Sequence, residues 1–138
     1  MHHYSFLTSP TPAQVQRIIS LYCEQDWWDS PETDNQYMIE RIVAGSHAFL
    51  IACEQEDIIG MGRAISDRVS DAYIQDVVVK TTCRGKGVGS EIITRLVARL
   101  HADGLHWIGL IAEQNSHPFY KQLGFDTMPN AQPMINLL

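Results

Sequence analysis

The chain has 138 residues, which is enough for one domain with a buried core and too few for two. Hydrophobic residues make up 45% of the chain and charged residues 19%, a composition that excludes a disordered protein. The net charge of -6 argues against a nucleic-acid partner, because phosphate contacts require a surplus of Lys and Arg. We therefore expect a single domain over residues 1–138.

The location of the protein and its metal content are also bounded by simple patterns. No apolar run approaches the ~20 residues needed to cross a bilayer, and Met1–Pro10 lacks the pattern of a signal peptide. We therefore expect a cytoplasmic protein with no membrane partner. The three cysteines are widely spaced and the histidines do not fall at ligand spacing, so we expect neither a disulfide framework nor a metal site.

The first half of the chain alternates between strand and helix patterns. Thr11-Pro12 has the residues of an N-cap and a first helical position, and apolar residues follow at helical spacing. A polar loop over residues 26–34 separates this helix from the next one, which Gly45 closes. The expected elements are a strand at Tyr4–Leu7, a helix from Thr11-Pro12, a helix at Asn35–Ala44, and strands at His47–Glu54, Ile58–Ile65 and Tyr73–Val79.

The second half contains the strongest helix pattern, in which Val88, Ile92, Leu96 and Leu100 repeat every four residues before Gly104. Hairpins followed by alternating strands and helices predict a mixed sheet in an α/β or α+β layer arrangement. The later expected elements are a strand at Trp107–Ala112, a short helix at His117–Leu123, and final strands at Phe125–Met128 and Met134–Leu138.

The segment most suited to chemistry is Arg84–Gly89, between a strand and a helix. A helix N-terminus offers unpaired amides, glycines let the backbone curl round a phosphate, and Arg84 and Lys86 add positive charge. This combination suits a pyrophosphate. The spacing excludes a dinucleotide fingerprint, and a Walker loop would need other residues at Lys80 and Gly87. A tight turn without a ligand is the structural alternative.

Two motifs give the sequence a family resemblance. Arg84-x-x-Gly87-x-Gly89 resembles the acetyl-CoA pyrophosphate loop of the Gcn5-related N-acetyltransferases (GNAT), and Phe119–Phe125 is similar to the second hallmark of that family. The motifs occur in the required order, and the resemblance covers roughly Tyr73 to Phe125. It implies a mixed, mostly antiparallel sheet of about six to seven strands flanked by about four helices.

The resemblance implies how acetyl-CoA is held. Backbone groups of the strand before the loop would pair with the pantetheine arm as an added strand does. The loop would hold the pyrophosphate, with a serine hydroxyl at the start of the helix. An asparagine contact is placed on Asn115, which lies five residues before Tyr120 where the family commonly has seven. The implied cofactor-binding residues are Val77, Val78, Val79, Arg84, Gly85, Lys86, Gly87, Val88, Gly89, Ser90, Asn115 and Tyr120.

The same resemblance implies the catalytic groups. Tyr120 would protonate the leaving thiolate, and packing in the core is its alternative role. Asp76 is the first candidate for the general base, because an acidic residue inside an apolar strand is costly unless it is used or paired. Glu113 is the second candidate. A hydrogen-bonded structural carboxylate is the alternative for both.

The acceptor pocket is placed on two regions. Trp27 follows Asp26 and Trp28 precedes Asp29, so aromatic walls beside two carboxylates could hold a cationic amine, although adjacent tryptophans cannot face the same way on a helix. Residues 74–79 resemble members that act on amino sugar phosphates, but Gln75 stands where those members have glutamate. Gln75 and Asp76 are therefore the other candidate substrate-binding residues.

Together these features imply an N-acetyltransferase that moves an acetyl group from acetyl-CoA to a primary amine of a small-molecule acceptor by direct attack, without a metal. The alternative is a non-catalytic acyl-CoA binding or sensing module that kept the loop and lost turnover. Many family members dimerise through late strands, and the apolar segment Met134–Leu138 suits such an interface, so the oligomeric state is left open with a homodimer among the alternatives.

Overall fold

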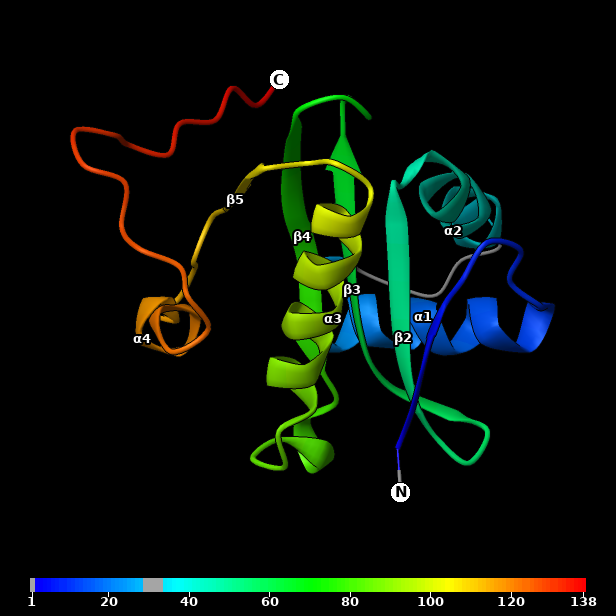
Figure 1. Cartoon of the computed structure of the whole chain (residues 1–138). Helices are drawn as coiled ribbons and strands as arrows, with labels where there is room; N and C mark the ends of the chain where they lie inside the picture. Colours follow the sequence, from blue (N-terminus) through cyan, green and yellow to red (C-terminus); the bar gives the residue numbers. More distant parts are fainter. Residues whose placement is uncertain (1, 29–33) are drawn as a thin grey trace.

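The computed structural model describes residues 2–28 and 34–138, and within them five strands form one sheet (Figure 1). The strand order is β1-β2-β3-β4-β5; the first four strands are antiparallel neighbours, and β5 joins β4 in parallel. The mostly antiparallel, mixed sheet predicted from the sequence is confirmed. The strands are β1 His3–Phe6, β2 Ala48–Glu54, β3 Asp57–Ser66, β4 Asp71–Val79 and β5 Trp107–Leu110.

Four α-helices accompany the sheet within the same residues, as the sequence predicts. The first begins with a capping box: the Thr11 hydroxyl accepts from the Gln14 amide at 3.2 Å, and the Gln14 side chain accepts from the Thr11 amide at 2.9 Å. The helices are α1 Pro12–Glu24, α2 Asp34–Gly45, α3 Val88–Ala102 and α4 His117–Lys121, with a short 3-10 helix, η1, at Thr81–Cys83.

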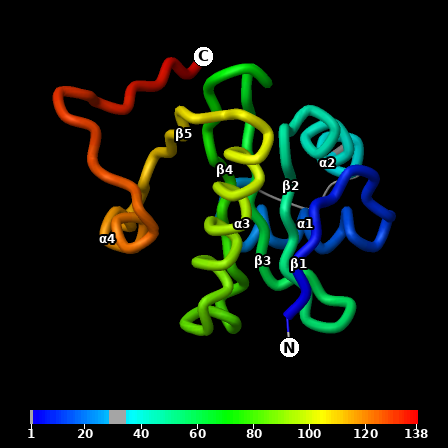
Figure 2. Tube along the Cα trace, in the orientation of Figure 1, coloured from blue at the N-terminus to red at the C-terminus, as the bar shows by residue number. Residues whose placement is uncertain are grey.

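The helices cover both faces of the sheet, as Figures 1 and 2 show with α3 on one face and α1 across the other. Alternate residues of β2 therefore enter different cores. Leu50 packs with Ile92 and Leu96 of α3, whereas Phe49 packs with Ile18 of α1. Burial on both faces explains why this strand reads as a nearly continuous apolar run.

The expected strands at Phe125–Met128 and Met134–Leu138 are wrong, because no strand forms in either segment. A strand needs a partner, and β5 offers a short edge of four residues. Pro129 and Pro133 interrupt the segment and cannot donate to a ladder. The chain after α4 instead forms no strand and passes outside the sheet (Figure 2), where Thr127 and Met128 line a cavity together with Trp107 of β5. The predicted strand count was therefore too high, and the predicted end of β5 at Ala112 was too late.

The sheet splits between β4 and β5. The two strands pair only from Asp71 opposite Trp107 to Ile74 opposite Leu110, whereas β4 continues to Val79 beside β3. Among the described residues, the β4 edge beyond Ile74 that faces β5 therefore has no strand partner. A split of this kind leaves backbone donors and acceptors available to a ligand.

A β-bulge lies at the split. Arg63 pairs with Gln75 and Met61 with Val78, so two residues of β4 stand opposite Gly62 alone. Asp76, the first of the two, has a left-handed φ of 55°. The extra residue reverses the alternation of side chains: Ile74 packs on the α3 face, whereas Val78 packs on the α1 face. Asp76 is thereby turned toward α1.

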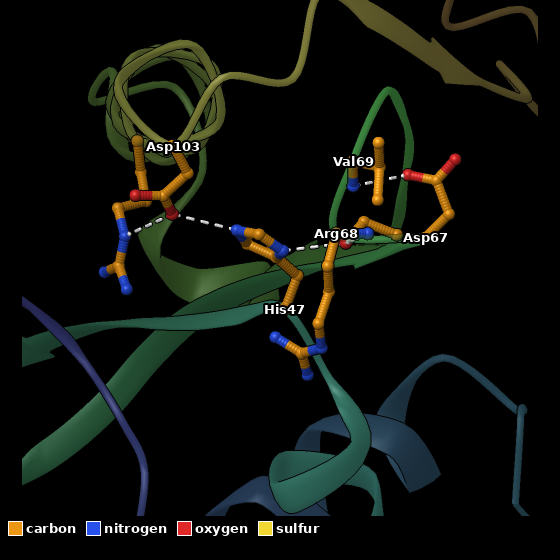
Figure 3. A network of polar contacts seen from close by, with 7 residues as sticks. His47, Asp67, Arg68, Val69 and Asp103 are labelled. Carbon is orange, nitrogen blue, oxygen red and sulfur yellow. Dashed lines mark hydrogen bonds and ion pairs between the residues drawn. The ribbon is translucent and has the colours of Figure 1, made fainter.

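A polar network is centred on His47, which precedes β2 (Figure 3). The His47 ring contacts the Ser66 hydroxyl at 2.7 Å and the Asp103 carboxylate at 2.8 Å, and Arg99 donates to the same carboxylate oxygen at 2.9 Å. The Arg68 amide donates to Ser66 at 2.9 Å. These contacts join the start of β2, the end of β3 and the end of α3, and we call them the His47 network.

Candidate active site

The loop between β4 and α3 has the geometry of an anion cradle. Gly85 and Gly87 adopt left-handed φ values of 80° and 82°, which a residue with a Cβ adopts at a cost. Gly87 is the N-cap of α3 and has no side chain to satisfy the first helical amides. Arg84 and Lys86 are exposed beside it. Backbone amides and cations therefore converge at one helix end.

The start of this loop is fixed to the rest of the protein. Glu24 of α1 accepts hydrogen bonds from the Thr81 hydroxyl and from the Thr81 amide, the latter at 2.7 Å, and these bonds lower the pKa of the Glu24 carboxyl. Lys80 pairs with Asp57 at 2.9 Å. Arg84 donates to the Val79 carbonyl at 3.1 Å. The first residues of the loop are therefore anchored to α1 and to β3 before a ligand arrives.

The three valines before the loop present their backbone at the split. The side chain of Val78 is buried with α1, whereas Val77 and Val79 pack partly buried on the α3 side. Gly89, on the first turn of α3, faces Phe119 of α4, whose ring atom would lie 3.4 Å from an added Cβ. Ser90 follows on the same first turn. The two sequence motifs therefore meet in space.

A cavity of about 480 Å³ opens at the split and collects the candidate catalytic groups. Its wall includes Trp27 after α1, Gln75 and Asp76 of β4, Glu113 after β5 and Tyr120 of α4. These residues come from three separate parts of the sequence, and the fold brings them to one surface. Asn115 is exposed with a left-handed φ of 60° and does not line this cavity.

Asp76 is held by two donors on one carboxylate oxygen. The Tyr22 hydroxyl and the Arg63 guanidinium each donate to its Oδ2 at 2.7 Å. Arg63 also reaches the Gln75 side chain at 3.3 Å. Burial is the larger cause and the Asp76 charge the second: together they hold the pKa of the Tyr22 phenol far above its usual range. This phenol therefore keeps its proton and stays a hydrogen-bond donor. We call these contacts the Asp76 network.

The sequence reasoning missed Tyr22 and Arg63. Tyr22 fits the apolar spacing of α1 and gives no separate signal. Arg63 did carry a signal, because it is a lone cation in the apolar strand β3, and a buried charge requires a partner. Read together with the acidic Asp76 in the next strand, it would have predicted their ion pair.

The adjacent tryptophans diverge, as expected for neighbours in sequence. Trp28 stacks on Tyr22, with ring centroids 4.6 Å apart and an angle of 11°, and packs against the core under α1. Trp27 is 40% exposed, lies tilted to Tyr22 and lines the cavity. Asp26 is exposed, and Asp29 lies outside the described residues.

Tyr120 reaches the cavity from α4. Its ring meets Phe119 and Phe125 edge to face at centroid distances of 5.0 and 6.0 Å. Burial, the larger cause, and the Glu113 charge both raise the pKa of the Tyr120 phenol. The phenol therefore carries its proton at neutral pH. Its hydroxyl makes no hydrogen bond to a described residue. A fixed, protonated phenol at a cavity wall is suited to donate a proton.

Within residues 2–28 and 34–138, no group of three His, Cys, Asp or Glu side chains is arranged to hold a metal ion. None of the helices in these ranges is long and apolar enough to cross a membrane.

Comparison of the sequence with known families matches the model of the acetyltransferase (GNAT) family over residues 14–125. Serotonin N-acetyltransferase 2 of Oryza sativa, a chloroplastic protein, is 41% identical over 53% of the chain, and histone acetyltransferase TAP1 of Glycine max is 38% identical over 55%. The chain spans 36% and 33% of the lengths of these two relatives.

Solved structures share the fold along the whole chain. An acetyltransferase of Trypanosoma brucei superposes with a TM-score of 0.80 at 20% identity, covering 99% of this chain and 100% of that one. A Clostridium acetobutylicum structure described as a predicted acetyltransferase with acetyl-CoA gives 0.71 at 21% identity, covering 98% and 96%. At these identities the likeness shows the fold.

Proposed function

The chain belongs to the GNAT family of acetyltransferases, and on that premise we propose that it transfers an acetyl group from acetyl-CoA to a primary amine of a small-molecule acceptor by direct attack. One observation carries the proposal. The split between β4 and β5 leads from the anion cradle to a cavity that holds Tyr120, Asp76 and Glu113. A cofactor arm in the split would end among these groups.

The residues present fit acetyl-CoA, which supplies the acetyl group. The amides and cations of Arg84–Gly89 would hold the pyrophosphate, with the Ser90 hydroxyl beside them. The free β4 edge over Val77–Val79 would pair with the pantetheine arm, although the Val79 carbonyl would first have to be shared with or released by Arg84. Asn115 stays a proposed contact from the family motif alone.

Proton transfers are assigned to three groups. Tyr120 donates its proton to the leaving thiolate. Asp76 binds the acceptor amine through Oδ1, which accepts no hydrogen bond from the described residues, and takes its proton as the first candidate base. Because Tyr22 and Arg63 already stabilise the Asp76 carboxylate, we retain Glu113, which is exposed on the same wall, as the second candidate.

The size of the cavity supports a small acceptor. A volume of about 480 Å³ falls in the range of small-molecule sites, and Trp27 and Gln75 supply an aromatic and a polar wall. The relatives carry names for both a small amine, serotonin, and a protein, histone. A cytoplasmic location stays a prediction beside chloroplastic relatives, as does a single acetyltransferase domain over residues 1–138.

We further propose a homodimer that uses the C-terminal segment. Met134, Ile135 and Leu137 are 91%, 80% and 79% exposed. Such a run of exposed apolar side chains is typical of a surface that a partner covers. Light scattering should give twice the chain mass, and Leu137→Asp should return the monomer.

Calorimetry and a thiol-release assay test the function. Acetyl-CoA should bind and raise the melting temperature, since ligand at 100 times its Kd stabilises by ~2.7 kcal/mol, and NAD and ATP should not do so comparably. Thiol release over a panel of primary amines should then reveal turnover. Binding without turnover on any amine would favour the sensing module, and absence of binding at millimolar acetyl-CoA would refute both.

A further inference from the structure

Resting on the proposed function, we propose that Tyr73 and Trp107 form an aromatic corner that selects acceptors carrying an aromatic ring near the reacting amine. The two side chains are 44% and 41% exposed, although both are large and apolar. Their ring centroids lie 5.1 Å apart at an angle of 59°. Neither belongs to the cores under α1 and α3. The pair therefore offers two tilted faces to solvent.

The corner is built into the strand by a glycine. A Cβ on Gly109 would stand 2.8 Å from two ring atoms of Trp107 and 3.3 Å from Tyr73. The Trp107 ring therefore lies across β5 where any side chain at position 109 would be. Glycine weakens a strand interior and often marks a close approach of another group. Here that group is the indole, which is held against the strand beside Tyr73.

The corner continues the candidate active site. Tyr73 lines the cavity of about 480 Å³ together with Asp76 and Tyr120. It also lines a second cavity of about 650 Å³ with Trp107, Gly109 and again Tyr120. One ligand can therefore extend from the first cavity into the second along Tyr73.

The register of the strands sets the length of that ligand. Tyr73 is level with Gly109, and Asp76 lies three residues further along β4, a distance of ~10 Å at the rise of an extended strand. An amine held by Asp76 would place a ring within about 10 Å of it on the corner. Tilted aromatic faces favour edge-to-face and offset packing of a third ring. A short arylalkylamine has this shape.

A pair of substrates tests the selection. We compare 2-phenylethylamine with n-propylamine, which share a primary amine and differ in the ring. The wild-type protein should show a kcat/KM ratio favouring the aryl amine on the order of 10-fold. Trp107→Ala should remove that preference through the KM of the aryl amine, with the acetyl-CoA KM unchanged. Tyr37→Ala is the matched control, because Tyr37 is 63% exposed on α2 and lines neither cavity.

Gly109→Ala supplies a second variant that keeps both rings. The added Cβ would collide with the indole and push it off the strand, so the aryl preference should fall while acetyl-CoA still binds. Calorimetric titration of 2-phenylethylamine in the presence of CoA measures the binding of the aryl amine to the corner without turnover. Equal kcat/KM for the two amines, or no aryl binding, would overturn the inference while leaving the acetyltransferase proposal intact.

A second copy of the chain is the alternative occupant of the aromatic corner. If it covers the corner, Trp107→Ala should lower the mass measured by light scattering and leave the aryl preference unchanged. That result would also overturn the inference. Failure of acetyl-CoA binding in the wild-type protein would instead refute the proposed function itself, so the two failures are distinguishable.

Discussion

The Asp76 network and the His47 network use nearly the same parts. In each, one carboxylate oxygen accepts from an arginine and from a ring-bearing side chain: Arg63 and Tyr22 at Asp76, Arg99 and His47 at Asp103. Their surroundings differ. In the His47 network, both ring nitrogens of His47 contact protein groups, and the His47 side chain is 8% exposed. In the Asp76 network, the carboxylate itself lines a cavity.

The backbone differs as well. Asp76 lies on a bulge in a left-handed conformation, a strained arrangement that is common where a side chain has been directed toward a functional site. Asp103 follows the end of α3, where an arginine one turn earlier is a natural partner. We infer that the same contacts stabilise the fold at Asp103 and prepare a reactive carboxylate at Asp76, because Asp76 lines the cavity that also holds Tyr120, whereas Asp103 lines neither of the two cavities described above.

The largest effect is expected at Tyr120. Tyr120→Phe removes one hydroxyl and keeps the ring that packs on Phe119 and Phe125. Turnover should fall by ~10²-fold or more with acetyl-CoA affinity nearly constant, since the lost interaction belongs to the transition state. Steady-state kinetics and calorimetry measure both quantities, with Tyr37→Phe as the control. Turnover equal to wild type would mean that another group protonates the thiolate.

The two networks can be compared directly by matched substitutions. Asp76→Asn should lower kcat/KM by about 10-fold or more and change the pH profile of the reaction, because it removes a candidate base. Asp103→Asn alters the same two-donor arrangement away from the cavity and should leave kcat/KM unchanged. Equal losses in both variants would show that Asp76 acts only through the stability of the fold.

A pair of glycines separates cofactor binding from backbone strain. Gly87 and Gly104 have left-handed φ values of 82° and 87°, and an added Cβ would meet no atom within 4 Å at either position. Val should therefore strain both sites by about 1–2 kcal/mol. Only Gly87→Val should also weaken acetyl-CoA binding, by on the order of 10-fold, because it disturbs the amide cradle. Equal acetyl-CoA affinities of the two variants, measured by calorimetry, would contradict the assignment of this loop as an anion cradle.

Local signals explain which parts of the fold were predictable. The capping box at Thr11 and the four-residue repeat from Val88 act within one or two turns, so the sequence alone reveals them. The final strands depend on a partner strand and not on their own residues. The apolar pattern of Met134–Leu138 therefore suggested a strand that does not form in the isolated chain.

The same distinction applies to the site. The loop residues could be placed together because they are adjacent in sequence, and the family motif placed Tyr120 near them. The contact of Tyr22 with Asp76 spans 54 positions and depends on the bulge, which turns Asp76 from the α3 face to the α1 face. One inserted residue reverses which face a strand residue occupies, and the sequence contains no local signal of it.

The smallest effect concerns the His47 network and the stability of the fold in acid. Hydrogen bonds from His47 and Arg99 lower the pKa of the Asp103 carboxyl below its ordinary range near 4. A depressed pKa in the folded state gives stability that is present above the unfolded pKa and is lost as the pH falls through the folded value. Asp103→Asn should therefore lower the melting temperature modestly at neutral pH, and the difference from wild type should shrink below about pH 4.

Differential scanning calorimetry across this pH range measures the difference in melting temperature. Asp126→Asn, on the exposed segment after α4, is the control and should show no such convergence. A difference for Asp103→Asn that stays constant down to the acid limit would mean that packing, and not the ionised carboxylate, carries the contribution of this network.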